Sequence, residues 1–306
     1  MMSKILVTGG TGFVGQRVVR DLLAQGHSLR LLTRRPLNDE RVEVRNIPDM
    51  EDEAALLEAM SGMEAVCHLA GRAHVLGAPP ADHELLFEQV NVEWTCRLAD
   101  TAFRSGVKRF VFVSSIGAVG TSSEAGAPLT EQTECRPTTP YGKSKLKAER
   151  KLAELAQRYG AELVIVRPPL VYGKGAPGNM ARMARWVRAG VPLPLRNVHN
   201  QRSLVHVDNL SAALLACLQH ADAPGHVFHV RDLQDYSTPD ILRGVAKDVG
   251  RPVRLIPFPS FMLRMLAQAA GQRGAYEQLT GTLQVDDAAI RKTLQFMPRS
   301  LPFEVV

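Results

Sequence analysis

Short apolar runs alternate with longer segments of helical periodicity through the first 170 residues. The apolar runs are typical of buried strands and are Ser3–Thr8, Ser28–Thr33, Val42–Asn46, Ala65–Leu69, Arg109–Ser114 and Glu162–Arg167. Between them, apolar residues recur at three- and four-residue spacing in Phe13–Gln25, Asp52–Met60, Leu85–Phe103 and Tyr141–Tyr159. This alternation predicts an α/β fold, a Rossmann-type doubly wound parallel sheet with helices on both faces.

The pattern changes beyond residue 170, where Gly and Pro become frequent and the segments are short and mixed. We expect a dinucleotide-binding domain over residues 1–170 and a smaller C-terminal substrate-binding lobe over 171–306. The apolar runs between 203 and 230 predict returns to the large sheet, at Ser203–Val207 and Val227–Val230.

Composition and charge narrow the classes of function. The 306 residues carry a formal net charge of +6, with Lys and Arg spread along the chain, so we expect an anionic substrate or cofactor and no nucleic acid. The four cysteines form no CxxC pair and are interpreted as free thiols in a reducing compartment. Since no apolar run is long enough to span a bilayer, we expect a cytoplasmic protein with no membrane partner.

A glycine pattern follows the first predicted strand. The run ILVTGGTGFVG places Gly9, Gly12 and Gly15, with Phe13 and Val14 between them, at the junction of a strand and a helix. One glycine allows a tight turn, a second lets backbone approach a pyrophosphate, and a third lets the helix pack close to the strand. The helix N-terminus then faces the phosphate charge, so we expect a nicotinamide dinucleotide here.

The end of the second predicted strand bears on the choice of cofactor. NAD-binding versions of this unit carry an acid there for the adenosine ribose, but this chain has Thr33, followed by Arg34 and Arg35. Guanidinium groups can form paired hydrogen bonds to a 2′-phosphate, so we favour NADP(H) over NAD(H). The alternative is that the two arginines are merely solvated at a strand end.

Three further residues match a proton-transfer site. Ser115 follows a predicted strand, and Tyr141 and Lys145 are spaced to lie one turn apart on one helix face. A cation near a phenol lowers the phenol's pKa, which lets tyrosinate act as general acid/base. Lys145 can also hold the nicotinamide ribose, and Ser115 can hydrogen-bond the substrate oxygen. We predict these three residues to be catalytic.

These motifs together resemble an extended short-chain dehydrogenase/reductase of the nucleotide-sugar epimerase/dehydratase group. VTGGTGFVG, HLAG, VNVEWT, TPYGKSK, RPPLVYG and RSLVHVDN all occur in the family's order. The resemblance implies the following roles, given in chain order: Asp49 and Met50 flanking the adenine; Leu69, Ala70 and Gly71 lining the cofactor; Pro168, Leu170 and Val171 beside the nicotinamide; Asn179 and Arg202 gripping the nucleoside diphosphate.

Other polar residues have simpler explanations. Asn179 would also serve as a helix N-cap, and Asp208 in HVDNL is expected to cap the next helix. His68 and Asn91 are interpreted as structural hydrogen-bonding groups, while His74 could reach the sugar. The histidines have no HExxH-like spacing and no Cys companions, so we expect no metal.

Departures from the family pattern guide the choice of reaction. The family's dehydratases carry a Thr-Asp-Glu run where this chain has Ser115 followed by Ile and Gly, which argues against a dehydratase. Arg34 favours a reductase of a UDP-linked 4-keto sugar that consumes NADPH. The alternatives are a UDP-sugar 4-epimerase with tightly bound NAD and, from another class, a non-catalytic NADP-binding redox sensor.

Two features leave the assembly open. The predicted helices Leu85–Phe103 and Tyr141–Tyr159 match those that pair in the family's four-helix dimer bundle, so we expect a homodimer. The segment Phe261–Ala270 is apolar enough to pack against the small lobe or against a partner, and the sequence does not choose between them.

Overall fold

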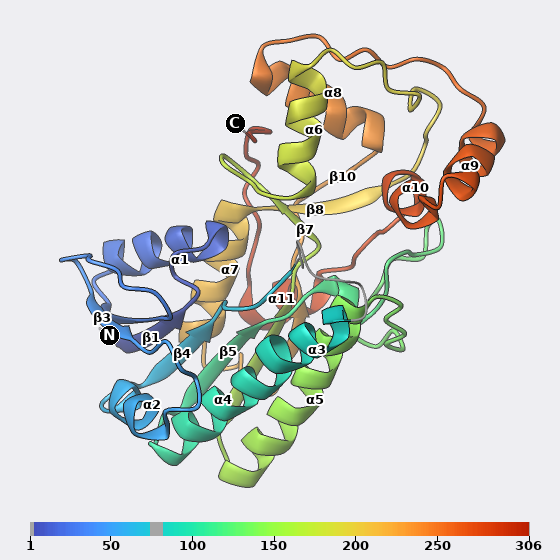
Figure 1. Ribbon diagram of the computed structural model, residues 1–306. Helices are drawn as coiled ribbons and strands as arrows, with labels where there is room; N and C mark the ends of the chain where they lie inside the picture. The colour runs from blue at the N-terminus through green and yellow to red at the C-terminus, as the bar shows by residue number, and fades with distance from the viewer. Residues whose placement is uncertain (1–2, 74–81, 306) are drawn as a thin grey trace.

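A large parallel sheet forms the body of the molecule (Figure 1). The computed structural model describes residues 3–73 and 82–305, and seven strands within them pair in the order β3-β2-β1-β4-β5-β6-β9, all parallel. Their bounds are β1 Lys4–Thr8, β2 Ser28–Thr33, β3 Glu43–Asn46, β4 Ala65–His68, β5 Arg109–Val113, β6 Glu162–Arg167 and β9 Val227–His229. The predicted α/β fold with a doubly wound parallel sheet is confirmed.

Helices cover both faces of this sheet and divide the core in two. The first face carries α1 (Phe13–Ala24), α7 (Val207–Gln219) and α11 (Ala288–Leu294), whose apolar residues join one cluster with the strands. The opposite face carries α2 (Glu53–Met60), α4 (Trp94–Arg104) and α5 (Pro140–Tyr159), which complete a second cluster. Strands buried on both sides explain the near-continuous apolar runs of the sequence.

The predicted helix Leu85–Phe103 is broken into three parts. It consists of α3 (His83–Phe87), a π-helical segment at Glu88–Glu93 and α4. A π-helical segment widens the turn and alters which side chains share a face. The change brings Asn91 to a buried position beside α5.

A second, smaller sheet supports the C-terminal lobe. It has the order β10-β8-β7, with β7 at Leu170–Tyr172, β8 at Arg202–His206 and β10 at Asp235–Tyr236. The strand predicted at Ser203–Val207 therefore exists but does not return to the large sheet, which is a correction. Two prolines follow β6 and lack amide donors, so the chain leaves the large sheet there and β8 pairs with β7 instead.

Four helices complete the lobe: α6 (Asn179–Arg188), α8 (Thr238–Val249), α9 (Ser260–Ala269) and α10 (Arg273–Thr280). The chain crosses between body and lobe more than once, because α7, β9 and α11 lie in the body although they follow residue 170. A boundary at residue 170 stays a prediction. In the described part of the chain, no helix combines the length and apolar character that a membrane crossing needs.

Candidate functional site

The turn between β1 and α1 leaves no room for side chains at its glycines. Gly9 has a φ of +70°, and a Cβ there would lie 2.7 Å from the Ala70 nitrogen. A Cβ on Gly15 would lie 2.0 Å from the Gly9 carbonyl oxygen, to which the Gly12 amide donates at 3.0 Å. The glycines thus allow a positive φ, a close strand–helix contact and an open backbone surface at the carboxyl edge of the sheet.

The start of α1 is free of a side-chain cap. Gly12 occupies the N-cap position without a side-chain hydrogen bond, and the first turn holds no acidic residue. Phe13 packs against the apolar cluster of the lobe and Val14 against the body core. With those side chains packed inward, amide groups at the helix start are left for an anion.

The carboxyl end of β2 carries an unpaired polar group. The Thr33 hydroxyl oxygen is buried and has no hydrogen-bond partner. Arg34 is exposed, with its guanidinium carbon 5.2 Å from the centroid of the Trp94 ring, and Arg35 is exposed as well. An orphaned hydroxyl, an uncapped helix start and a turn without side chains fit a dinucleotide at this edge.

Hydrogen bonds from Thr8 join the ends of β1 and β4. The Leu69 amide donates to the Thr8 carbonyl and the Ala70 amide to the Thr8 hydroxyl, both at 3.2 Å. His68 places Nδ1 2.7 Å from the Thr8 hydroxyl and Nε2 3.0 Å from that of Thr95. Burial lowers the pKa of His68 to about 3, so the ring is neutral and structural, as predicted.

Asn91 fixes the turn that follows β4. Its side-chain amide donates to the Ser144 hydroxyl and to the Arg72 carbonyl, both at 3.0 Å, and its carbonyl accepts from the Arg72 amide at 2.8 Å. A Cβ on Gly71 would lie 3.5 Å from the Nζ of Lys145. The structural role predicted for Asn91 is confirmed, and it holds Gly71 against the lysine.

Ser115 and Tyr141 meet across a close backbone contact. Ser115 caps a short 3₁₀ turn, Ile116–Ala118, where its hydroxyl accepts from the Gly117 amide at 3.0 Å. A Cβ on Gly142 would lie 2.2 Å from the Gly117 carbonyl oxygen, so only glycine lets α5 approach this turn. The approach brings Tyr141, in the first turn of α5, within hydrogen-bonding reach of Ser115.

The charges around the phenol differ from expectation. Burial raises the pKa of Tyr141, and its hydrogen bond with Ser115 offsets this only in part. The predicted lowering by Lys145 is absent, because Nζ donates to the Val113 carbonyl at 2.8 Å and lies 4.4 Å from the centroid of the Phe112 ring. Burial lowers the pKa of Lys145 to about 8.

The sequence analysis did not predict a buried ion pair that lies one helical turn from Lys145. Arg167 donates to Glu149 at 2.6 and 3.0 Å, and the Ser114 hydroxyl donates to the same carboxylate. Glu149 and Arg167 are only 4% and 5% exposed. Glu149 follows Lys145 by one helical turn, and its charge raises the lysine's pKa against the effect of burial. That i, i+4 spacing was the available signal.

The chain after β6 passes directly beside Ser115. The Pro168 carbonyl accepts from the Ile116 amide at 2.9 Å, and Leu170 and Val171 then begin β7 in half-buried positions. These residues therefore lie at the same sheet edge as the serine, and their contact with a nicotinamide stays a prediction.

Asp49 and Met50 lie after β3, near the outer edge of the large sheet. Asp49 is exposed and accepts from the amide of Glu51 at 2.8 Å, whereas Met50 is buried in the core cluster of the α2 face. Neither position excludes contact with adenine, which stays a prediction.

The two predicted diphosphate residues lie in the lobe. Asn179 is the first residue of α6, and the N-cap is Gly178. The side-chain carbonyl of Asn179 accepts a hydrogen bond from the Arg182 guanidinium at 2.9 Å. Arg202 begins β8, donates to the Gly281 carbonyl at 2.8 Å, and burial lowers its pKa. The N-cap explanation of Asn179 is therefore wrong, and Arg202 is held by one backbone contact.

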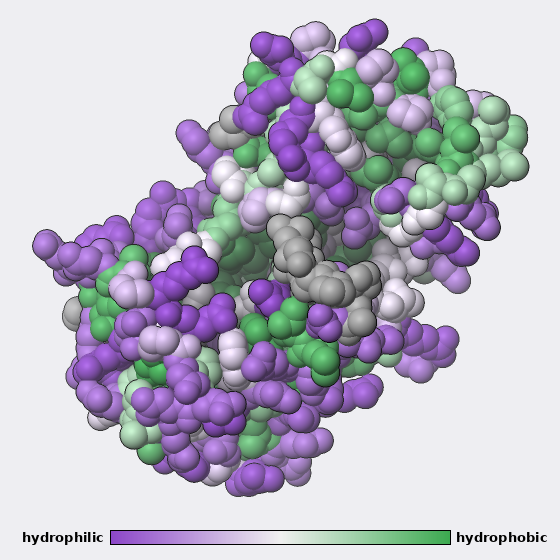
Figure 2. Space-filling view, in the orientation of Figure 1, coloured by the Kyte–Doolittle hydropathy of each residue, from purple (hydrophilic) through white to green (hydrophobic). Residues whose placement is uncertain are grey.

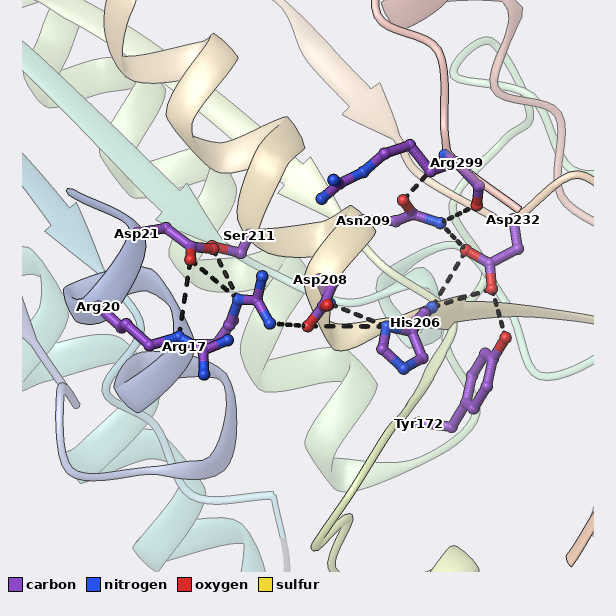
Figure 3. Close-up of polar contacts among 10 residues, drawn as sticks. All are labelled: Arg17, Arg20, Asp21, Tyr172, His206, Asp208, Asn209, Ser211, Asp232 and Arg299. Atoms are coloured by element: carbon purple, nitrogen blue, oxygen red, sulfur yellow. Dashed lines mark hydrogen bonds and ion pairs between the residues drawn. The ribbon is translucent and has the colours of Figure 1, made fainter. Parts of the chain in front are cut away.

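A polar network links α1 with the small sheet (Figure 3). The cap of α7 is His206, which accepts from the Asp208 amide at 3.2 Å, so the expected cap at Asp208 is wrong. Asp208 instead pairs with Arg17 of α1. The buried Asp232 accepts from the His206 amide and from Tyr172 at 2.8 Å. Arg17, His206 and Asp208 line a cavity of about 770 Å³ beside the glycine turn.

Two remaining expectations concern histidines and metals. His74 lies outside the described residues. Within residues 3–73 and 82–305, no group of three or more His, Cys, Asp or Glu could hold a metal ion.

Comparisons with known proteins agree with this geometry. A family model described as "NAD dependent epimerase/dehydratase family" matches residues 5–230. A UDP-glucose 4-epimerase from Vibrio cholerae is 35% identical over 97% of this chain and 92% of its own length. An N-acetyl-alpha-D-glucosaminyl-diphospho-ditrans,octacis-undecaprenol 4-epimerase from Escherichia coli O157:H7 is 26% identical over 86% and 78%. The structure of a UDP-glucose 4-epimerase from Thermotoga maritima aligns with a TM-score of 0.78 at 21% identity, covering 98% and 95%.

Proposed function

The chain belongs to the NAD dependent epimerase/dehydratase family, and on that premise we propose that it interconverts the C4 epimers of a UDP-sugar. The observation that carries this proposal is the meeting of Ser115 and Tyr141 at the carboxyl edge of the sheet, with Lys145 one turn along α5. The glycine turn lies at the same edge after β1, which is separated from β5 by β4 alone. Ligands bind at this edge in doubly wound sheets, where the strand order reverses between β1 and β4.

Each of the three side chains has a separate task in the proposed reaction. A bound nicotinamide would supply a hydride acceptor and donor facing C4 of the sugar. Ser115 donates a hydrogen bond to the C4 oxygen, while Tyr141 removes the hydroxyl proton and later returns it. Lys145 holds the cofactor's ribose, for which its ammonium group supplies hydrogen-bond donors.

The lobe is proposed to bind the diphosphate of the substrate. One guanidinium nitrogen of Arg202 donates to the Gly281 carbonyl, which orients the guanidinium group. Its other N–H groups remain as donors for the diphosphate. A guanidinium forms paired hydrogen bonds with phosphate oxygens, and Asn179 at the start of α6 adds a neutral donor. These two side chains could bind the diphosphate of any nucleotide sugar. The proposal of a uridine nucleotide therefore depends on the similarity to the Vibrio cholerae relative.

A reductase is the second candidate, and one observation favours it. The end of β2 has Thr33 where a carboxylate would accept the ribose hydroxyls, and Arg34 and Arg35 follow. This favours NADP(H), which a reductase consumes and an epimerase does not need to exchange. We place the epimerase first because the Vibrio cholerae relative, 35% identical over nearly the whole chain, is named as one.

Cofactor demand distinguishes the two candidates. The protein is incubated with UDP-glucose and with UDP-N-acetylglucosamine without added cofactor, and separately with a UDP-4-keto-6-deoxy sugar and NADPH or NADH. We expect the C4 epimer to form in the first reaction. Stoichiometric loss of NADPH in the second, with no epimer in the first, would establish the reductase instead.

Tyr141→Phe tests the proton-transfer step. General acid–base catalysis contributes about 10²–10⁴-fold, so we expect turnover to fall by that factor. Tyr159→Phe is the matched control, because Tyr159 lies at the far end of the same helix, where its hydroxyl donates to Asp100 at 2.8 Å. Full activity of the Tyr141→Phe protein would rule out the mechanism.

A further inference from the structure

Four large apolar side chains are exposed together on α9. Phe261, Met262, Met265 and Leu266 are 67%, 42%, 67% and 58% exposed. Their spacing of one, three and four residues puts them on one side of the helix, which we call the α9 stripe. Because large apolar side chains on a soluble surface are usually scattered, four on one face call for an explanation.

α9 and α10 pack against each other, and their contacts with the lobe hold the α9 stripe outward. Leu263, on the other side of α9, packs against the apolar cluster of the lobe. The Tyr276 hydroxyl of α10 donates to the Ser260 carbonyl at 3.3 Å, which ties the two helices together. The end of α10 is fixed by Thr238, whose hydroxyl donates to the Leu279 carbonyl at 2.6 Å. The α9 stripe is thus presented by an anchored helix.

The surface around the α9 stripe is basic. Residues 251–280 contain four arginines and one glutamate, a net charge of +3, which is half of the net charge of the whole chain. Arg264 lies on α9 itself, and Arg254 precedes it on an exposed segment. The single acid, Glu277, is paired with Arg273 at 2.7 Å. An apolar face with Arg264 on its own helix and a net positive charge in the segments that flank it is complementary to an anionic surface.

Other exposed apolar residues do not form such a group. Leu85 and Met297 are 70% and 62% exposed, but Leu85 lies on α3 and Met297 in the segment after α11. In Figure 2 hydrophobic colour spreads over the outer end of the lobe, where Figure 1 places α9 and α10. The clustering therefore belongs to the lobe.

We propose that the α9 stripe docks the protein on the surface of an anionic lipid bilayer. The apolar side chains would enter the boundary between headgroups and acyl chains, and Arg254 and Arg264 would meet lipid phosphates. With ten residues, α9 is about 15 Å long, which allows it to lie in the interface but not to cross the bilayer. The expectation of no membrane partner was based on the lack of an apolar run long enough to span a bilayer. That criterion does not detect a helix that binds a bilayer surface through one apolar face.

Docking would place the substrate lobe at the membrane. Arg202 donates to the carbonyl of Gly281, directly after α10, so the diphosphate grip proposed above adjoins the docking helices. The docking proposal stands on the α9 stripe and its charges, and does not depend on the reaction catalysed.

Vesicle flotation with the full-length protein tests the proposal. The wild-type protein is mixed with phosphatidylcholine vesicles that contain or lack phosphatidylglycerol. We expect binding to the anionic vesicles, about tenfold weaker binding to the neutral ones, and weakening by high salt. Since two apolar side chains would leave the interface, Phe261→Ser with Met265→Ser should reduce binding by at least about tenfold. Arg264→Glu should weaken binding to the anionic vesicles alone.

Met297→Ser is the matched control, because it removes a methionine of nearly equal exposure outside the α9 stripe. It should bind vesicles like the wild type. Failure of the wild type to bind anionic vesicles overturns the proposal, as does equal weakening by the control. Sedimentation velocity adds a third arm: if Phe261→Ser with Met265→Ser converts a dimer to monomers, a second copy of the chain covers the α9 stripe and the proposal is wrong. Epimer formation in solution, measured in parallel, is expected to be unchanged.

Discussion

Lys145 is a charged group placed where water hardly reaches. Its side chain is enclosed by the ring of Phe112, the carbonyl of Val113 and the turn at Gly71. Burial lowers its pKa to about 8, and the carboxylate of Glu149 opposes that effect. The ammonium form, which the proposed mechanism needs, therefore predominates at neutral pH and is lost as pH rises through about 8.

This balance predicts an alkaline limit of activity at the residue scale. Lys145 is charged below its pKa and neutral above it, so kcat/KM should fall as pH rises through about 8. Glu149→Gln removes the charge that raises the lysine's pKa, and we expect the falling limb to move to lower pH. The measurement is the pH profile of kcat/KM, with Glu154→Gln, an exposed carboxylate on the same helix, as control.

The same substitution leaves Arg167 without its counterion. Removing one partner of a buried ion pair costs about 3–5 kcal/mol, so the free energy of unfolding should fall by about that amount, measured by urea denaturation. A falling limb at an unchanged pH in a folded Glu149→Gln protein would show that Glu149 serves packing alone.

The residues of the catalytic group could be named from the sequence, but their electrostatics could not. Spacing places Tyr141 and Lys145 on one face of α5, and the structure keeps them there. The direction of the Tyr141 pKa was wrong, because it depends on burial and on where Nζ finds an acceptor. Arg167 was missed because it ends an apolar strand, and its partner Glu149 lies on another element.

At the scale of elements, the strands of the large sheet were predicted within one residue at each end, because strands buried on both faces appear as short apolar runs. The short strands β7 and β10 were not predicted. Which sheet a strand joins is a different question. β8 is apolar enough for either sheet, and its partner is decided by the path of the chain after β6. The π-helical segment at Glu88–Glu93 was missed because a change of helical face over six residues is too short to stand out in the apolar spacing of the sequence.

Gly15 offers a test of the glycine turn as a unit. A Cβ at Gly15 would lie 2.0 Å from the Gly9 carbonyl oxygen, so Gly15→Ala must push α1 away from β1. We expect cofactor affinity to drop by at least about tenfold, and stability by about 1–3 kcal/mol, because overpacking shifts backbone. Calorimetric titration with NAD and NADP gives the first quantity and urea denaturation the second.

Gly274→Ala is the control for that substitution. Gly274 lies in α10, and nothing comes within 4 Å of a Cβ placed there, so alanine should be neutral or stabilise the helix by up to about 1 kcal/mol. If Gly15→Ala binds both dinucleotides as tightly as the wild type, the turn does not carry the cofactor.

For the whole molecule, the network of Figure 3 connects the cofactor helix with the lobe. Arg17 of α1 pairs with Asp21 at 2.8 Å and with Asp208 at the start of α7. His206 joins that helix to β8, and Asp232 accepts from both His206 and Tyr172 of β7. Each contact in this network joins polar side chains that are buried or half-buried. A displacement of α1 can therefore be transmitted through these contacts to the small sheet.

Arg17→Gln tests whether the two parts are coupled through this route. The substitution removes the cation of the half-buried Asp208 and the nearer of two cations of Asp21, which should cost about 1–3 kcal/mol in the free energy of unfolding. Arg20→Gln is the control: Arg20 is 63% exposed and 3.8 Å from Asp21, so its loss should change stability by less than about 0.5 kcal/mol. Because Arg17 also lines the cavity beside the glycine turn, dinucleotide affinity is measured in parallel. A raised KM for the sugar nucleotide with unchanged dinucleotide affinity in Arg17→Gln would show that α1 positions the lobe. An unchanged KM together with the stability loss would confine the network to folding.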